Sequence, residues 1–218
     1  ENEYYTVFKK YINFKACTFE RGVDFAYSQF QGNVTFVSTI FNEYVHFSGT
    51  HFLEDAYFNY SNFTKEFNCN DATFNKDAHF HNIRFNEVVN CAYVKFSGDT
   101  YFFDSVFKEA SYFNNSTFSG ISDFSGIVFY KNISINNNEF SGDVYFCGTH
   151  FKEDVNFSDS VFYSYTDFGK SEYNEFTIFD GRADFSGVSF MGKINFEGAV
   201  FNDDYDFLGA EHYGKPYK

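Results

Sequence analysis

The hydrophobic pattern of this chain is a ladder of phenylalanines spaced alternately five and six residues apart. Between His46 and Phe63 the phenylalanines stand at positions 47, 52, 58 and 63. In steps of 11 from Phe14 to 179, thirteen of sixteen positions are Phe, and from Phe8 to 173 fifteen of sixteen are Phe. A pattern that keeps its phase over so much of a chain is an internal repeat, so it determines the fold.

Each repeat predicts one very short strand followed by a corner. Two positions before each phenylalanine stands a small or β-branched residue, as at Val45 and Thr50, with one polar residue between them. This is the inward, outward, inward alternation of a strand. Two outward residues follow, often including Gly, Asn or Asp, which favour turns. A helix is excluded, because steps of five and six would scatter the rings around its axis.

The order of the steps predicts a coil with four sides. Steps of 5, 6, 5 and 6 give a 22-residue coil, and a flattened coil of 11 residues is the alternative. At a period of 22, the exceptions to the ladder, Cys69, Cys91 and Ile135, all fall in one column, which favours 22. Because parallel strands lie about 4.8 Å apart, about nine such coils would stack into a rod. We therefore expect one all-β domain over residues 1–218, a parallel β-helix.

The repeat unit resembles that of the pentapeptide-repeat family. Clear copies stand at 45–55, 144–154 and 183–193, and the resemblance extends from about Phe8 to Phe207. The resemblance implies a right-handed quadrilateral β-solenoid whose phenylalanines and small residues face inward. The chain departs from the family pattern by one inserted residue in every second repeat, and by Phe where Leu is common.

Two regions depart from the regular ladder. The steps on either side of Phe179 are both six, which predicts that the segment 169–182 has lost one five-residue half. A local bulge or re-paired corner is favoured there over a functional loop. Residues 208–218 are expected to be a short non-repeat tail. No amphipathic helix is evident near either end, so we expect uncapped terminal coils.

Composition narrows the classes of function. The chain holds 36 Phe and 18 Tyr but no Trp, and its formal net charge is −14. An acidic surface repels nucleic acid and permits basic partners. No apolar run is long enough to span a bilayer, so membrane insertion is not expected. Seven N-x-S/T sequons are compatible with a secreted protein. The compartment stays open, with an extracellular or cell-surface location favoured over the cytoplasm.

Two groups of residues are candidates for covalent or metal chemistry. Cys69 should lie directly beneath Cys91 on the next coil, as a disulfide or as two buried thiols. No CxxC or zinc-type spacing occurs. Asp55, Asp77 and Asp99 form a column of like charges and are weak candidates for a cation site, with a solvated acidic edge as the favoured alternative.

A column of outward rings is the candidate contact surface. Tyr57, His79, Tyr101 and Tyr145 share one face at a period of 22. Such a stripe can bind protein, and a stacking ladder between coils is the equal alternative. The histidines form no recognisable set of nucleophile, base and orienting group, and no phosphate-binding glycine motif occurs. We therefore expect neither an enzyme nor a cofactor.

Two functions remain. The first is a structural or interaction scaffold that associates with itself through its solenoid ends, as a filament or cell-surface subunit. The second follows from the resemblance, because some pentapeptide-repeat proteins are acidic rods that mimic DNA and bind type II topoisomerases such as gyrase. Those relatives typically dimerise through a C-terminal helix, and some carry projecting loops. Neither feature is evident in this sequence.

Overall fold

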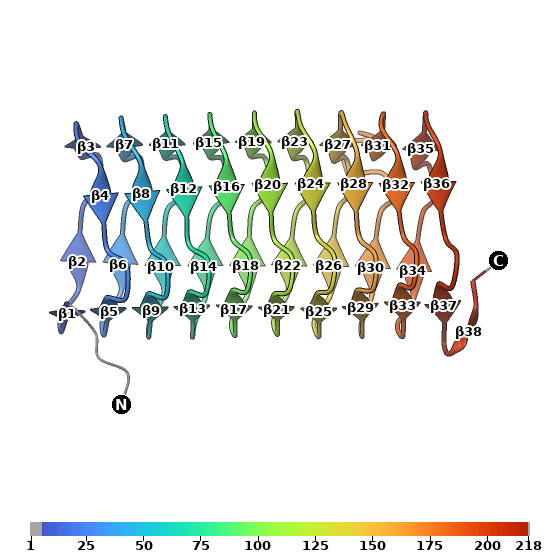
Figure 1. Cartoon of the computed structure of the whole chain (residues 1–218), viewed down its shortest axis with the longest axis horizontal. Coiled ribbons are helices and arrows are strands. Elements are labelled where there is room, and N and C mark those ends of the chain that lie inside the picture. The colour runs from blue at the N-terminus through green and yellow to red at the C-terminus, as the bar shows by residue number, and fades with distance from the viewer. Residues whose placement is uncertain (1–5, 218) are drawn as a thin grey trace.

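The protein is a rod of stacked coils, seen along its length in Figure 1. This computed structural model describes residues 6–217, which contain 38 two-residue strands and no helix. One coil comprises β9 (His51–Phe52), β10 (Ala56–Tyr57), β11 (Asn62–Phe63) and β12 (Phe67–Asn68). The equivalent strands of successive coils form four sheets, which we call sheets A, B, C and D in that order.

The register of the sheets confirms the 22-residue coil. In sheet B, Ala56 pairs with Ala78, and in sheet C, Asn62 pairs with Arg84. Both pairs are parallel and join residues 22 apart in the sequence. The backbone groups of each coil are therefore satisfied by the coils before and after it. The flattened coil of 11 residues is excluded, and the four-sided solenoid of about nine turns is confirmed.

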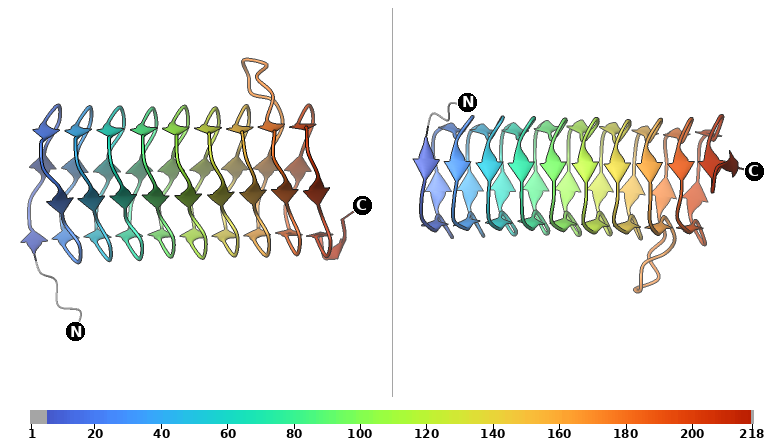
Figure 2. Two further views of the ribbon diagram at one scale, coloured as in Figure 1. Left: turned by 45° about the horizontal axis from the view of Figure 1, so that its top comes forward. Right: turned by 90° about the horizontal axis from the view of Figure 1, so that it is seen from below.

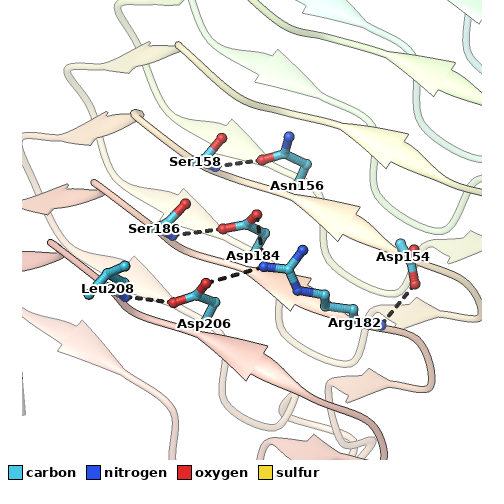
Figure 3. A network of polar contacts seen from close by, with 8 residues as sticks. All are labelled: Asp154, Asn156, Ser158, Arg182, Asp184, Ser186, Asp206 and Leu208. Atoms are coloured by element: carbon cyan, nitrogen blue, oxygen red, sulfur yellow. Dashed lines mark hydrogen bonds and ion pairs between the residues drawn. The ribbon is translucent and has the colours of Figure 1, made fainter.

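The corners explain why the repeat contains Asp before Phe and Gly after it. At the end of β32 (Ala183–Asp184), the Asp184 carboxylate accepts the Ser186 N–H at 2.9 Å, and Gly187 has a φ of 66°. One coil later, Asp206 accepts the Leu208 N–H at 2.8 Å, as Figure 3 shows. An aspartate that bonds the backbone two residues on begins a tight turn, and a glycine completes it at low conformational cost.

Phenylalanine rings fill the centre of the rod. The ring centroid of Phe58 lies 5.1 Å from that of Phe36 and 4.7 Å from that of Phe80, with planes inclined by 11° and 4°. Within the same coil, Phe52 meets Phe58 edge to face at 6.1 Å and 84°. Stacked and edge-to-face pairs both suit the ring quadrupole. The ladder of the sequence is thus a continuous, buried ladder of stacked rings.

Sheet D departs from this ladder where Cys69 replaces phenylalanine. Two residues earlier, Phe67 occupies the place that Val45 holds one coil before and Val89 one coil after. The Phe67 ring is fully buried and lies 4.8 Å from that of Phe63. In this coil the aromatic ring stands two positions earlier than in the regular repeat, so the same volume of aromatic side chain fills the core and the packing stays dense.

The irregular segment is an insertion. β27 (His150–Phe151) pairs with β31 (Ile178–Phe179), and His150 is opposite Ile178, 28 residues away instead of 22. The prediction that a five-residue half is missing was therefore wrong: six residues are added after β30 (Thr166–Asp167). Together with the four residues that link the equivalent strands β26 (Val144–Tyr145) and β27, they form a loop, residues 168–177, that projects from the rod in both views of Figure 2. The expectation that no projecting loop is present was wrong as well.

The C-terminal tail forms a hairpin. β37 (Glu211–His212) continues sheet A parallel to β33 (Ser189–Phe190), and β38 (Lys215–Pro216) returns antiparallel to β37. The two turn residues, Tyr213 and Gly214, have φ values of 52° and 67°. Positive φ at both central residues is typical of a two-residue hairpin turn. β38 therefore closes the edge of sheet A at this end.

An aromatic ring covers the last coil. Tyr217 lies over Phe207, with ring centroids 4.9 Å apart and planes inclined by 20°. The expectation of an uncapped C-terminal coil was wrong, because the tail pairs with sheet A and covers part of the core. At the other end, Phe8, Phe14 and Phe19 are only partly buried. Residues 1–5 and 218, which belong to the predicted domain, lie outside the described part of the chain.

Candidate interaction surface

The outward side chains of sheet B form the face that the sequence singles out. We call this row the sheet B face, and its members occupy equivalent positions in successive coils. They are Asn13, Thr35, Tyr57, His79, Tyr101, Asp123, Tyr145, Asp167 and Asn195. Backbone hydrogen bonds between equivalent strands of successive coils set the distance between these strands, so the outward side chains are presented at a constant spacing along the rod. We call each such strand position a rung.

The aromatic stripe is continuous over three coils. His79 stacks on Tyr57 at 4.6 Å and 7°, and on Tyr101 at 5.1 Å and 15°. A second stack lies beside it, where His81 and Phe103 are 4.5 Å apart at 8°. Tyr145 stands apart from the stripe, because Asp123 occupies the rung between it and Tyr101. The structure therefore brings three of the four predicted residues together and adds a second column.

The aspartate column has a structural role. Asp99 accepts the Ile121 N–H of the next coil at 2.8 Å and the Tyr101 hydroxyl at 3.2 Å. Asp77 accepts the Asp99 N–H at 2.9 Å, and Asp55 accepts the Tyr57 hydroxyl at 3.0 Å. Among residues 6–217, no group of three or more His, Cys, Asp or Glu side chains is placed to hold a metal ion. The like charges are stabilised instead by N–H and O–H donors, which explains why they are tolerated in a stack.

The pKa values of the face reflect burial beside carboxylates. Burial, with the neighbouring Asp99, raises the pKa of Tyr101 to about 12. Burial lowers the pKa of His79 below its usual 6.5, although Asp77 acts in the opposite direction. The tyrosines are therefore hydroxyl donors at neutral pH, and the imidazole is neutral. The surface combines neutral rings with a line of negative charge.

The cysteines are separate features. The Sγ atoms of Cys69 and Cys91 lie 2.9 Å apart, and both side chains are buried. They are free thiols in the structure, so the disulfide stays a prediction. Burial raises the pKa of Cys91, which keeps its thiol protonated. Burial and the Asp167 carboxylate raise the pKa of Cys147 to about 12, so this half-buried thiol is a poor nucleophile at neutral pH.

Loop 168–177 stands at the C-terminal part of the sheet B face. Its base is held by Thr177, whose hydroxyl lies 2.8 Å from the carbonyl oxygen of Phe146 and 2.7 Å from that of Gly169. The same hydroxyl accepts the Gly148 N–H at 3.0 Å. The loop exposes Tyr173, which is 79% exposed. Sequence reasoning missed this surface, and the changed step from Phe179 to Phe185 was the only signal of it.

One histidine–carboxylate pair merits comparison with an active site. His150 Nε2 lies 2.6 Å from Asp180 Oδ2 on sheet C. The outward neighbours of His150 on the adjacent rungs are Val128 and Ile178, which offer no nucleophile. A histidine and its orienting carboxylate without a nucleophile do not make a catalytic set.

Within residues 6–217 no helix is long and apolar enough to cross a bilayer.

Comparison with known proteins places this repeat in a family. A family model described as pentapeptide repeats (nine copies) matches residues 36–84. This match includes the coil from β9 to β12. Residues 36–84 are pentapeptide repeats. The same pattern of strands continues outside the matched residues, from β1 (Val7–Phe8) to β36 (Tyr205–Asp206), in the same four sheets. The repeats build a scaffold of stacked coils.

A solved structure is also similar to this chain. It is that of QnrB1, described as a plasmid-mediated fluoroquinolone resistance protein, with 14% sequence identity. The similarity covers 95% of this chain and 91% of that chain, with a TM-score of 0.19. A search of the curated proteins finds no match.

Proposed function

We propose that this protein is a scaffold that binds other proteins through the sheet B face. The observation that carries the proposal is the stacked column Tyr57–His79–Tyr101 beside the aspartates that bond it. Aromatic residues that are held rigidly lose little entropy on binding, and they are enriched at protein interfaces. The coils pair throughout the rod, so the face is presented without rearrangement.

The experiment compares two double variants on immobilised protein. Tyr57→Ser/Tyr101→Ser removes two rings from the sheet B face, and Tyr112→Ser/Tyr163→Ser removes two exposed rings elsewhere. We expect an extract of the source cells to contain a protein retained by the wild type and by the control variant but lost from the face variant. Direct binding of that purified protein should show the same order. Identical retention by all three proteins would refute the role of this face.

End-to-end self-association is the second part of the proposal. The partly buried phenylalanines of the first and last coils favour it, since stacking would cover them. Because β38 closes sheet A at the C-terminal end, a further parallel coil there requires the hairpin to move. Sedimentation velocity over a wide concentration range tests the idea. Growth of the rod with concentration is expected, and a strictly monomeric rod at every concentration would rule it out.

The alternative is an acidic DNA mimic that binds a type II topoisomerase. Two adjacent columns of carboxylates along the rod and the net charge of −14 support it. One column holds Asp55, Asp77, Asp99 and Asp143, and the other holds Asp123 and Asp167. A gyrase supercoiling assay with added protein tests this function. Inhibition or protection that is lost in Asp77→Asn/Asp99→Asn is expected, and no effect at a large excess would remove the alternative.

A further inference from the structure

A cleft lies between the inserted loop and the sheet B face. Its volume is about 580 Å³, and it is lined on one side by loop residues 170–173 and 175 and on the other by residues of four successive coils. Five carboxylates and one ammonium group line it. The carboxylates belong to Asp104, Asp123, Asp167, Glu172 and Glu175. A concave site with such an excess of one charge concentrates ligands of the opposite charge.

The carboxylates differ in how far they are already satisfied. Both carboxylate oxygens of Asp167 already accept hydrogen bonds, one from the Tyr165 hydroxyl at 2.7 Å and the other from the Gly169 N–H at 2.7 Å. Within the described residues, Asp104, Glu172 and Glu175 form no ion pair, and neither does Lys170, the ammonium group of the lining. Three negative charges thus face a common space without a cationic partner.

The same space is lined by aromatic rings. Tyr145 and Phe103 come from the rod, and Tyr173 comes from the loop. The Glu172 carboxylate bonds the Tyr173 hydroxyl and raises its pKa, a sign of the negative potential at the rim. Rings beside carboxylates favour a delocalised organic cation, which can lie against a ring face while its N–H groups bond the oxygens.

The spacing of the acids disfavours a metal ion. No group of three metal-binding side chains within residues 6–217 is close enough to hold one. A guanidinium group spans a larger distance and carries five N–H donors in a planar fork. Acids too far apart for one metal ion can therefore share one arginine side chain.

The loop is ordered before any ligand arrives. The Ser171 N–H donates to the Glu175 carbonyl at 2.8 Å, and the Asn174 N–H donates to the Ser171 carbonyl at 3.0 Å. Gly148, with a φ of 69°, lies under the loop, where an added Cβ would stand 3.2 Å from that of Ser171. A wall that is already fixed reduces the entropic cost of binding.

We propose that this cleft binds an arginine side chain presented by a basic segment of a partner protein. The inference rests on the proposed role in protein binding, and it identifies the chemistry of one contact. A peptide fits better than a free polyamine, because Tyr173 is 79% exposed and Phe176 is 49% exposed. Tyr173 in the lining and Phe176 outside it offer apolar contact to the residues that flank the arginine.

The test uses a blocked glycine–arginine peptide with two arginines and its neutral citrulline counterpart. Titration calorimetry at about 0.15 M salt limits long-range attraction between charges. We expect saturable binding of the arginine peptide and none of the citrulline peptide. Glu172→Gln/Glu175→Gln should weaken binding by about tenfold or more, because two charge-assisted contacts are lost. Tyr173→Ala should weaken it without changing the net charge.

A second acidic cleft supplies the matched control. It is lined by Glu43, Tyr44, Lys65, Glu66, Glu87 and Val88, and there Lys65 already pairs with Glu87 at 3.8 Å. Glu43→Gln/Glu66→Gln makes the same change in net charge and should leave the affinity within about twofold, since exposed distant charges are screened. Equal losses in both double variants would overturn the proposal, as would equal binding of the citrulline peptide.

Two further outcomes keep this test separate from the proposed function. Loop-dependent binding of spermidine without binding of the arginine peptide would overturn the assignment to a protein segment. Absence of any binding would also overturn it, while retention of a partner through Tyr57 and Tyr101 would remain open to its own test. Circular dichroism of each variant checks that the exposed substitutions leave the rod folded.

Discussion

Phe67 fills the core at the rung where Cys69 replaces the phenylalanine of the repeat. The two residues have exchanged size, so each is expected to depend on the other. Phe67→Val alone should destabilise the protein by about 3 kcal/mol through a cavity. Cys69→Phe alone should cost about 1–3 kcal/mol through overpacking. The double variant restores the regular pattern and should return to within about 1 kcal/mol of the wild type.

Chemical denaturation of the four proteins in this cycle measures the coupling. The inverse exchange, Val45→Phe/Phe47→Cys on the preceding coil, is the control for a tolerated swap. Strict additivity of the two single changes at Phe67 and Cys69 would show that the ring positions are independent.

Two buried threonines should respond in opposite directions to loss of the hydroxyl. Thr166 Oγ1 is buried without a hydrogen-bond partner, whereas Thr50 Oγ1 donates to the Phe25 carbonyl at 2.7 Å. Valine already occupies equivalent rungs at Val144 and Val94. We therefore expect Thr166→Val to stabilise and Thr50→Val to destabilise, each by about 1 kcal/mol. Unfolding in guanidinium measures both, and the same sign at both sites would contradict this account.

Thiol reactivity should separate the four cysteines. Cys69 and Cys91 are buried, and burial raises the pKa of Cys91, so neither should be alkylated in the native protein. Cys17 is exposed and should react first, and Cys147 should react slowly. After unfolding under non-reducing conditions, mass spectrometry should find four alkylated thiols. A product with two alkylated thiols and two fewer hydrogens would instead establish the disulfide between Cys69 and Cys91.

The aromatic cap at the C-terminal end should stabilise its own coil and little else. Tyr217→Ala removes the ring that stacks on Phe207 and should cost the last coil about 1–2 kcal/mol. In a solenoid each coil contacts only its neighbours, so hydrogen exchange should accelerate from β33 to β37 and stay unchanged in the first coils. Tyr163→Ala, at an exposed ring, is the control. A uniform increase along the rod would argue for a fully cooperative unit.

Stability should fall as the solution becomes mildly acidic. Burial lowers the pKa of His79, and it lowers those of His51 and His81 as well. The unfolded chain therefore binds protons near the usual pKa of 6.5 before the folded chain does. The stabilisation is fully present above that pH and is lost as the pH falls below it. His79→Phe keeps the stack with Tyr57 and Tyr101 and should flatten the dependence of thermal stability on pH below the usual histidine pKa of 6.5.

The sequence predicted the fold because the phenylalanines report it directly. Most rings of the ladder are buried, and the period of 22 could be read because the exceptions Cys69, Cys91 and Ile135 all fall in one column. The insertion was misread for a physical reason. Six added residues place Phe179, which belongs to sheet C, on the grid of 11 whose other members follow strands of sheets B and D. In a pattern with a period of 11, an insertion of six residues and a deletion of five shift the later phenylalanines to the same positions, so the pattern alone does not distinguish them.

The surface was harder to predict than the core. The stripe from Tyr57 to Tyr101 followed from alternation, but the bonds of Asp99 to the next coil depend on corner geometry that the ladder does not encode. The segment around Tyr213 and Gly214 lacks the repeat, so the sequence predicted only a short non-repeat tail and not a hairpin. The cleft combines residues from a loop and four coils, and no local pattern brings those residues together.

The corner between sheets B and C accepts extra chain without disturbing the rod. On both sides of loop 168–177 the strands stay in register, as at His150 with Ile178 and at Thr166 with Ile194. The entropic cost of closing a loop rises only slowly with its length. A foreign epitope could therefore be inserted at this corner and presented on the rigid rod. The same tolerance offers an evolutionary route. A lineage of such rods can acquire a new recognition element by one short insertion, with its inherited core left untouched.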